Sequence, residues 1–330
     1  MTANGHVNGK MTAPGVHSRY HIGTPDQPWS DKERDQWRSE QTKKRDYFTD
    51  VVSPLLRFTG GDVFQYGSLD YRHFGAANYP LYAVKSSKWD RSRPLVVVTG
   101  GVHGYETSGV WGALLFVQEQ FHKYTQKVNL LVLPCISPWG YETINRWTPE
   151  AVDPNRCFKP TTPGCAEAAQ AMATIITHVQ QSTGVLMHTD LHETTDTDNS
   201  EFVPAKAARD GLPIPDWDPI PDGFYLIGHE PRPQLEWHKT MMAAVQKVTH
   251  IADPDERGTI VGEKPVAPGI LILGSVGDCG SHTSAEFCCT TEVYPDSERT
   301  TEEICNVAQC TAVVAGLDFA LQHSSLLKQK

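Results

Sequence analysis

The chain has 330 residues, with 29 basic against 39 acidic side chains and a net charge of -10. Because no dense stripe of lysine and arginine offsets this charge, we expect neither nucleic acid nor membrane as a partner, and the composition favours a small substrate. No apolar run approaches the roughly 18 residues of a membrane span, and the polar N-terminus lacks the hydrophobic core of a signal peptide. We therefore expect a cytoplasmic protein, whose oligomeric state the sequence leaves open.

The N-terminal part differs in composition from the rest of the chain. Residues 1–28 are rich in Gly, Asn, Thr and Pro without apolar periodicity, which predicts a disordered or loosely draped leader without chemistry. Ser30 can cap a polar helix over 31–48, so that residues 29–59 form an N-terminal helical extension. Residues 60–330 then have the length of one large domain, and they contain no internal repeat.

Strands and helices alternate along this domain. Apolar and β-branched runs predict strands at 63–66, 81–85, 95–98, 128–136, 185–192 and 286–294, with a further apolar segment at 270–273. Helical patterns cover 107–120, 166–181, 234–251 and 302–321. This alternation predicts a single three-layer α/β/α domain with a mixed, mostly parallel, twisted sheet. The stretch 194–233 is rich in Pro and Asp and contains Trp217, and we expect it to be a loop that shapes a pocket.

One short motif stands at the end of the strand predicted at 95–98. The chain passes through Gly100 and Gly101 into His103 and Glu106, at the point where a helix takes over. Residues three apart in a helical turn lie about 5 to 6 Å from each other, close enough for an imidazole and a carboxylate to bind one metal ion. A glutamate in a first helical turn also complements the helix dipole without any metal. Alone, the pair favours that simpler explanation.

A metal site needs a third protein ligand, and His192 is the natural candidate. It ends a buried strand, and in an open parallel sheet the carboxyl ends of the strands meet at the edge where His103 also lies. His188 is a rival, but on a strand it would lie about 13 Å from His192. Asp190 shares the face of His192 and can accept a hydrogen bond from its imidazole. We expect Glu193 to face away, with a surface role.

Two further segments offer groups for hydrolysis. Arg146 and Arg156 lie in loop-like sequence after a strand, the second within Asp-Pro-Asn-Arg, although ordinary surface charge would explain both. Glu292 lies within a β-branched strand, where an unpaired carboxylate is costly to bury. Exposure on an edge strand or a pairing with an arginine would account for it without catalysis.

The order of these motifs resembles the M14 family of zinc carboxypeptidases, which are carboxypeptidase A-like and include an aspartoacylase and succinylglutamate desuccinylase branch. That order is His-x-x-Glu, Pro-x-Gly-Tyr with a downstream arginine, Asn-Arg, a strand ending in histidine, and a late strand with a glutamate. Every member occurs here between about residues 60 and 325. The resemblance implies that residues 60–330 form a zinc carboxypeptidase-like catalytic domain.

The resemblance also implies a role for each matching residue. It predicts one zinc ion per chain with three protein ligands, which are His103, Glu106 and His192. Asp190 would accept a hydrogen bond from the imidazole of the ligand His192. Glu292 becomes the general base and Arg146 the group that polarises the oxyanion, while Asn155 and Arg156 hold a carboxylate of the substrate.

This chain departs from the family pattern in two places. Carboxypeptidases of the family carry a tyrosine on a mobile loop before the catalytic glutamate, but no tyrosine lies between Tyr225 and Tyr294. In the corresponding loop, 274–284, His282 is a substitute donor for the substrate, with a solvated loop histidine as the simpler alternative. The aspartoacylase branch carries an additional β-rich domain after its glutamate, whereas one helix and a short tail follow Glu292 here.

We therefore expect a zinc-dependent hydrolase that cleaves an amide or peptide bond next to a free carboxylate, in a small anionic substrate. An N-acyl-amino-acid deacylase needs the same groups and remains an alternative. A non-catalytic metal-binding scaffold is the alternative of another class, with the missing loop tyrosine as its support. Trp139, Trp147 and Trp217 indicate either an apolar portion of the substrate or ordinary packing.

Overall fold

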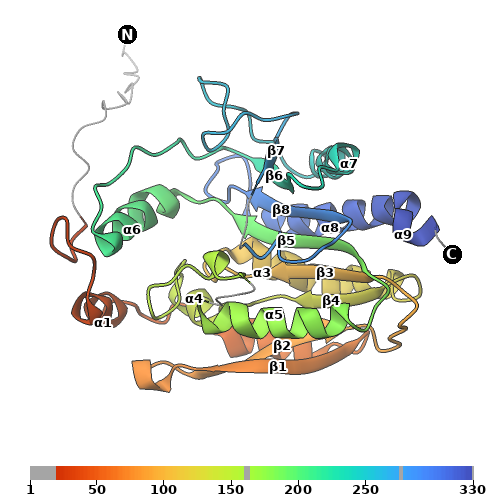
Figure 1. Ribbon diagram of the computed structural model, residues 1–330, viewed down its shortest axis with the longest axis horizontal. Coiled ribbons are helices and arrows are strands. Elements are labelled where there is room, and N and C mark those ends of the chain that lie inside the picture. The colour runs from red at the N-terminus through yellow and green to blue at the C-terminus, as the bar shows by residue number, and fades with distance from the viewer. Residues whose placement is uncertain (1–19, 160–163, 275–277, 329–330) are drawn as a thin grey trace, which may run out of the picture.

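A mixed β-sheet of eight strands runs through the computed structural model, which describes residues 20–159, 164–274 and 278–328 (Figure 1). The strands are β1 (Asp62–Asp70), β2 (Asn78–Lys85), β3 (Leu95–Gly100), β4 (Asn129–Leu133), β5 (Val185–Glu193), β6 (Phe224–His229), β7 (Ile270–Leu273) and β8 (Phe287–Val293). In space they follow the order β1-β2-β4-β3-β5-β8-β6-β7. The central strands β4, β3, β5 and β8 are parallel, whereas β2 and β6 run antiparallel to them. The expected mixed, mostly parallel sheet is confirmed.

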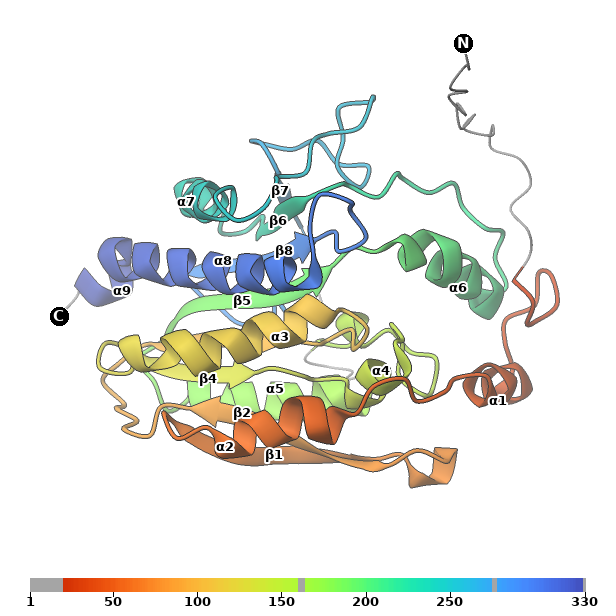
Figure 2. The same cartoon turned by 180° about the vertical axis from the view of Figure 1, so that it is seen from behind.

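Helices cover both faces of the sheet, as the two opposite views show (Figures 1 and 2). One face carries α5 (Ala166–Val179), and the other carries α3 (Thr107–Leu115) and α8 (Glu302–His323). Shorter helices and helical turns complete the structure: α1 (Asp31–Ser39), η1 (Phe48–Val52), α2 (Ser53–Arg57), η2 (Arg72–Phe74), η3 (Phe116–Gln120), η4 (Phe121–Lys123), α4 (Pro138–Thr143), η5 (Pro154–Arg156), η6 (Asp198–Phe202), α6 (Val203–Asp210), α7 (Leu235–Val245) and α9 (Ser325–Lys328). The predicted three-layer architecture is therefore confirmed.

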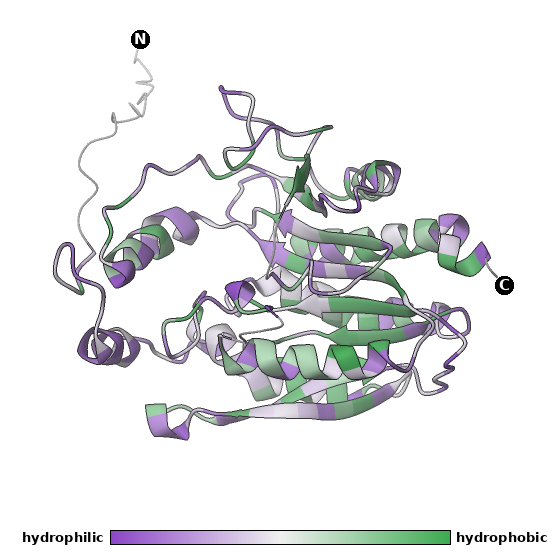
Figure 3. Cartoon of the chain, viewed as in Figure 1, coloured by the Kyte–Doolittle hydropathy of each residue, from purple (hydrophilic) through white to green (hydrophobic). Residues whose placement is uncertain are grey.

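The central strands are buried on both sides, which explains their continuous apolar runs. Every residue of β3, β4 and β5 is buried. Val96 and Val98 belong to the core shared with α3 and α8, while Leu95 and Val97 belong to the core under α5. Figure 3 shows that these central strands are hydrophobic, whereas α1 at the periphery is hydrophilic. All eight cysteines are buried and free, in agreement with the absence of Cys-x-x-Cys pairs.

The helix predicted over 31–48 is wrong in length. α1 ends at Ser39, and a second helical stretch starts at Phe48 and continues through α2. The carboxylate of Asp46 accepts a hydrogen bond of 2.8 Å from the backbone N–H of Thr49, which satisfies a free donor at the start of this second stretch. Residues 40–46 lack apolar periodicity, so nothing extends α1 across them.

The predicted leader is only partly within the described residues, because residues 1–19 lie outside them. Residues 20–28 are not disordered as expected. Tyr20 and Ile22 are buried, and the Tyr20 hydroxyl donates a hydrogen bond of 2.7 Å to Glu201. The backbone N–H of Trp29 donates to the carbonyl of Arg209, 2.9 Å away. This segment therefore packs against the region of α6.

The stretch 194–233 is not one loop. It contains η6, α6 and β6, and its longest irregular segment is residues 211–223. α6 has Pro204 in its first turn and ends at Gly211, whose φ is 67°, so both ends carry ordinary helix signals. The prolines and aspartates around these short elements conceal them in the sequence.

One helical stretch among the described residues, Glu302–Lys328, is long and apolar enough to cross a membrane by length and composition alone. Half of its most apolar window is buried inside the protein. α8 packs against α3, α7 and the sheet, where Ala312 and Leu317 are fully buried. Its apolar character is therefore explained by the core.

A buried carboxyl group on α5 should make the stability depend on pH. Glu167 is buried, accepts a hydrogen bond from the hydroxyl of Tyr71, and leaves Oε2 without a partner. Burial raises the pKa of Glu167 from 4.5 to about 7. The folded protein thus binds a proton more tightly than the unfolded chain, and this contribution to stability is lost as the pH rises from about 4.5 through 7.

Glu167→Gln should therefore raise the free energy of unfolding at pH 8, by on the order of 1 to 3 kcal/mol, and change it little at pH 5. Thermal unfolding at the two pH values measures this difference. Glu298→Gln, at an exposed glutamate, serves as the matched control. An equal shift of Tm at both pH values in Glu167→Gln would contradict the assignment.

Candidate metal site and active-site cavity

His103 and Glu106 lie on the loop between β3 and α3, where the sequence places them. Gly101 turns the chain with a φ of 59°. At Gly104 a Cβ atom would lie 2.1 Å from the backbone nitrogen of Tyr141, so only glycine lets this loop rest against α4. His103 Nδ1 is 2.7 Å from Glu106 Oε1, and both side chains are buried.

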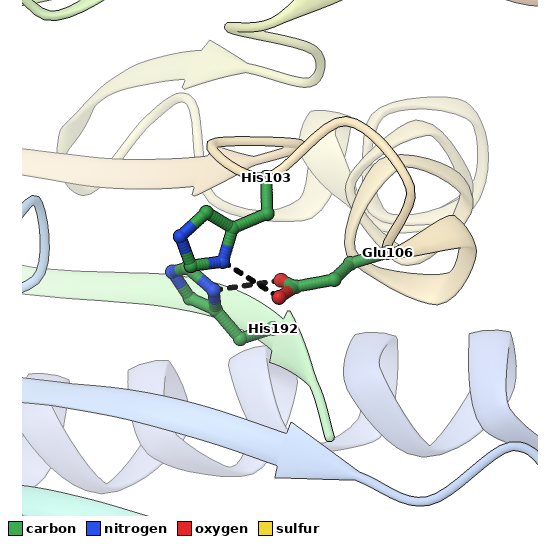
Figure 4. A group of neighbouring side chains, drawn as sticks. All are labelled: His103, Glu106 and His192. Carbon is green, nitrogen blue, oxygen red and sulfur yellow. Dashed lines mark hydrogen bonds and ion pairs between the residues drawn. The ribbon is translucent and has the colours of Figure 1, made fainter. Parts of the chain in front are cut away.

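His192 joins this pair from the carboxyl end of β5, the strand next to β3. Its Nδ1 lies 2.7 Å from Glu106 Oε2, and the two imidazole centroids are 4.9 Å apart. Figure 4 shows both rings directed at the carboxylate of Glu106. One ligand atom from each of the three residues lies within 4.8 Å of the others. The structure thus brings the three predicted ligands together.

Two carboxylates determine which ring nitrogens face Glu106. His192 Nε2 lies 2.8 Å from Asp190, and His103 Nε2 lies 3.0 Å from Asp153. The tautomer with the hydrogen on each Nε2 satisfies these two carboxylates and leaves each Nδ1 with a lone pair toward Glu106, which is the arrangement that a metal ligand requires. Asp190 occupies its predicted place behind His192. The partner of His103 was not predicted, although Asp153 begins the Asp-Pro-Asn-Arg segment.

The cluster fits a metal ion. Two lone pairs and a carboxylate converge, and all three groups are acceptors. Glu106 Oε2 is buried and makes no hydrogen bond, although it lies 2.7 Å from His192 Nδ1. A buried carboxylate oxygen without a donor is costly, and a cation between the three groups removes that cost. Two imidazoles and one carboxylate are also a ligand set of catalytic zinc sites.

Two other residues of β5 have structural roles. His188 is buried between Thr99 and Thr283, both 3.1 Å away, and burial lowers its pKa to about 4. It lies outside the metal cluster, as the spacing along the strand predicts. The expected surface role of Glu193 is wrong. Glu193 is buried and accepts hydrogen bonds from the backbone N–H groups of Thr107 and Ser108, so it caps α3.

Glu292 faces the cluster from β8. It pairs in register with His192 on β5 and with Tyr225 on β6, so the three side chains share one face of the sheet. The Thr194 hydroxyl lies 3.0 Å from Glu292 Oε2 and 2.6 Å from the hydroxyl of Tyr225. Burial raises the pKa of Glu292 to about 8. β8 is an inner strand, and no arginine pairs with Glu292 within the described residues, so neither simple explanation for this glutamate holds.

Arg146 is held in an ion-pair network and is not an ordinary surface charge. Its Nη1 lies 2.9 Å from Asp198 and 3.3 Å from the Tyr105 hydroxyl, and its Nε lies 3.2 Å from Asp153. Nη2 makes no hydrogen bond within the part of the chain that the structure describes. Through Asp153, the guanidinium is linked to His103.

Arg156 and Asn155 differ in how far hydrogen bonds within the protein already hold their side chains. Arg156 is exposed and makes one hydrogen bond, 2.9 Å long, to the carbonyl of Asn155. Asn155 is buried, and its Oδ1 accepts from the backbone N–H of Cys279 at 2.8 Å. Arg156 is therefore free to bind a ligand, whereas Asn155 also fixes the loop after β7.

One cavity of about 700 Å³, the active-site cavity, connects most of the predicted site residues. Those that line it are His103, Glu106, Arg146, Asn155, Arg156, His192 and Glu292. Trp217 also lines it, as expected for the irregular segment, and so do Thr194, Asp198 and Tyr225, which the sequence analysis missed. Thr194 lies two residues beyond His192, and residues two apart on a strand face the same side, so this spacing could have identified Thr194 as a cavity residue. Tyr225 lies on a strand that was taken for a loop.

His282 is not part of this cavity. Its ring lies against Phe158, with centroids 6.0 Å apart, and it is absent from the lining of this cavity, so its contact with substrate stays a prediction that this arrangement does not favour. Trp139 and Trp147 are also packing residues. Both surround Trp37, with ring centroids 5.9 and 5.5 Å from it. Of the three tryptophans considered, only Trp217 reaches the cavity.

Comparison with known proteins places this site in context. Residues 92–211 match the model of the succinylglutamate desuccinylase/aspartoacylase catalytic domain. No curated protein matches the sequence at a significant level. A candidate metallopeptidase from Shewanella amazonensis has a similar structure, with a TM-score of 0.61, 19% identity, and coverage of 83% of this chain and 91% of that chain. One from Shewanella denitrificans has a TM-score of 0.61, 17% identity, and coverage of 84% and 90%.

A metallo-carboxypeptidase from Pseudomonas aeruginosa, in complex with (2-guanidinoethylmercapto)succinic acid, is also similar. Its TM-score is 0.52 at 15% identity, with coverage of 89% of this chain and 70% of that chain. Identities this low establish the fold, and the domain match adds the segment from β3 to α6 that holds the metal cluster. Together they support the resemblance: the chain shares the fold of these metallopeptidases and of the metallo-carboxypeptidase, and residues 92–211 are similar to the succinylglutamate desuccinylase/aspartoacylase catalytic domain.

Proposed function

We propose that the protein is a zinc-dependent hydrolase that cleaves an amide or peptide bond next to a free carboxylate. The observation that carries this proposal is the common cavity of three unlike groups. A cluster of metal-ligating side chains, a carboxylate at Glu292 and a ligand-free guanidinium at Arg156 all line it. These are the groups that metal-assisted hydrolysis of an anionic amide requires.

The zinc ion would be held by His103, Glu106 and His192, one ion per chain. When bound, zinc polarises a carbonyl and lowers the pKa of a water molecule from about 15.7 to about 7. Asp153 and Asp190 hold the two imidazoles in the tautomer that directs Nδ1 at the metal.

Glu292 would act as the general base. Thr194 donates a hydrogen bond to its Oε2, which orients the carboxylate, while Oε1 has no hydrogen bond among the described residues and Glu292 lines the cavity. Oε1 would take a proton from the attacking water and return it to the leaving nitrogen. The raised pKa of Glu292 favours this proton exchange near neutral pH, because a general base is most effective when its pKa is close to the pH of the solution.

The two arginines would have different tasks. Arg156 uses one of its five N–H donors, so it can bind a carboxylate bidentately and fix the scissile bond over the metal cluster. Asn155 would line this clamp. Arg146 is fixed by Asp153 and Asp198, and its Nη2 remains available to stabilise the oxyanion.

An N-acyl-amino-acid deacylase is the second candidate, and the match to the succinylglutamate desuccinylase/aspartoacylase domain favours it. The Pseudomonas carboxypeptidase binds a succinic acid derivative, which supports a carboxylate-bearing substrate for either candidate. A scaffold without turnover has the least support, because a pure metal-binding protein has no need of Glu292 beside the ligands.

A direct test compares the zinc-loaded and the chelated protein on C-terminal dipeptides and N-acyl amino acids. Zinc should bind at one equivalent, raise Tm and support hydrolysis of one substrate set, since a metal that binds only the folded state stabilises it. His192→Ala should lose all three effects, whereas His122→Gln, at an exposed histidine, should keep them. Stoichiometric zinc without turnover on any amide would leave the scaffold as the better description.

Glu292→Gln should lower kcat by about 10²- to 10⁴-fold, because a positioned general base contributes that much. Zinc content, measured by elemental analysis, should stay at one equivalent, since Glu292 is not a ligand. The control is Glu298→Gln, at an exposed glutamate six residues further on. Turnover close to that of the parent would remove Glu292 from the role of base.

Arg156→Ala should raise KM by roughly 10- to 100-fold for substrates with a free carboxylate, since a hydrogen bond to a charged group is worth about 1.5 to 3 kcal/mol. The KM for the corresponding carboxamide substrate should change little, because this substrate has no negative charge for Arg156 to bind. Steady-state kinetics with the two substrates separates these cases. An unchanged KM for the carboxylate would show that the clamp lies elsewhere.

A further inference from the structure

A second cavity of about 590 Å³ opens next to the active-site cavity, with which it shares Arg146, Arg156, Asp198 and Val203. α1 and α6, which lie at the same end of the molecule, contribute to its walls (Figures 1 and 2). We call it the basic cavity, because five cationic side chains line it: Arg34, Arg146, Arg156, Lys206 and Arg209. On a chain with a net charge of -10, such a concentration of positive charge needs a physical explanation.

Ion pairs within the cavity neutralise only two of these cations. Asp153, Asp198 and Asp210 are its carboxylates. Arg146 binds the first two, and Arg209 lies 2.8 Å from the third. The acidic side chains that line the cavity are thus already engaged by these two arginines.

Three cations have no carboxylate partner among the described residues: Arg34, Arg156 and Lys206. Arg34 donates one hydrogen bond, to the carbonyl of Glu150 at 2.9 Å. Arg156 likewise donates one, to the carbonyl of Asn155. A guanidinium has five N–H donors, so each retains four. The Lys206 side chain is exposed to the cavity.

The wall between these cations is fixed before any ligand arrives. Arg209 donates to the carbonyl of Ala151 at 2.8 Å, and its guanidinium lies 4.6 Å from the ring centroid of Trp147. Trp147 is buried. Arg34 is tied to the same loop through Glu150. The backbone and the side chains of Trp147 and Arg209 that form this wall are thus already held by contacts within the protein.

We propose that the basic cavity is a binding site for an oxyanion group, a carboxylate or a phosphate, held between Arg34 and Lys206 next to Arg156. The group has two sources. It is a free anion, or it is a second acidic group of the substrate that reaches past the Arg156 carboxylate clamp. The first source is independent of the proposed hydrolysis, and the second rests on it.

The free anion is tested by calorimetric titration of the full-length protein with sulfate, whose charge does not change between pH 5 and 9. We expect saturable binding that weakens as sodium chloride is added, because the cations are partly exposed. Lys206→Gln should weaken it about three- to tenfold, and Lys206→Arg should restore it. Lys247→Gln, at an exposed lysine outside the cavity, should leave it unchanged.

The attached group is tested with two substrates of the enzyme that differ only in a second carboxylate. If the basic cavity binds part of the substrate, Lys206→Gln raises KM for the diacid by about three- to tenfold. The kcat for the diacid and the KM for the monoacid stay unchanged. Arg34→Gln should act in the same direction. Because the sulfate titration needs no turnover, failure of the proposed function would not affect it. Sulfate affinity and KM values that are both the same in Lys206→Gln as in the parent would overturn the proposal.

Discussion

The carboxylate of Glu106 between two imidazoles is the interaction on which the rest of the site depends. A buried carboxylate without compensation is expensive, and Glu106 meets this cost only through groups that arrive from other parts of the chain. His103 comes from the same loop and His192 from the neighbouring strand. The glycines before α3 allow that loop to turn and to approach α4 closely. Burial opposes the ionisation of Glu106, but the positive charge of the imidazoles in their protonated form outweighs it and holds the pKa of Glu106 below the usual range.

Strand register brings Glu292 next to His192 and so adds a carboxylate to the group of His103, Glu106 and His192. His192, Glu292 and Tyr225 are opposite one another on three adjacent strands. A slip of one residue in either pairing would turn Glu292 to the other face of the sheet. The register is secured by side chains on both faces, since Cys289 and Val293 pack in one core and Cys288 in the other.

The sequence was most informative where the chemistry follows local order. His103, Glu106, His192 and Glu292 are recognisable because each lies at or near the end of a strand in a fixed succession. Asp153, Asp198 and Thr194 are not, because their roles depend on which long-range partners meet them in space. The same limit explains His282, whose ring turns to Phe158 and away from the cavity. No local pattern encodes the direction of a loop side chain.

Secondary structure followed the same division. Buried strands such as β3 and β5 carry strong apolar runs, so their positions were predicted to within a few residues. α6 and β6 are short and lie among prolines and aspartates, and their stability comes from contacts that the sequence does not display, such as those of residues 20–29 with α6.

Glu193 couples the position of His192 to that of Glu106 in the proposed metal site. This carboxylate follows His192 directly and binds the first two N–H groups of α3, which begins one residue after Glu106. Glu106 and His192 are therefore coupled to each other through the backbone and this helix cap, so that a displacement of α3 would move both members of the proposed metal site together.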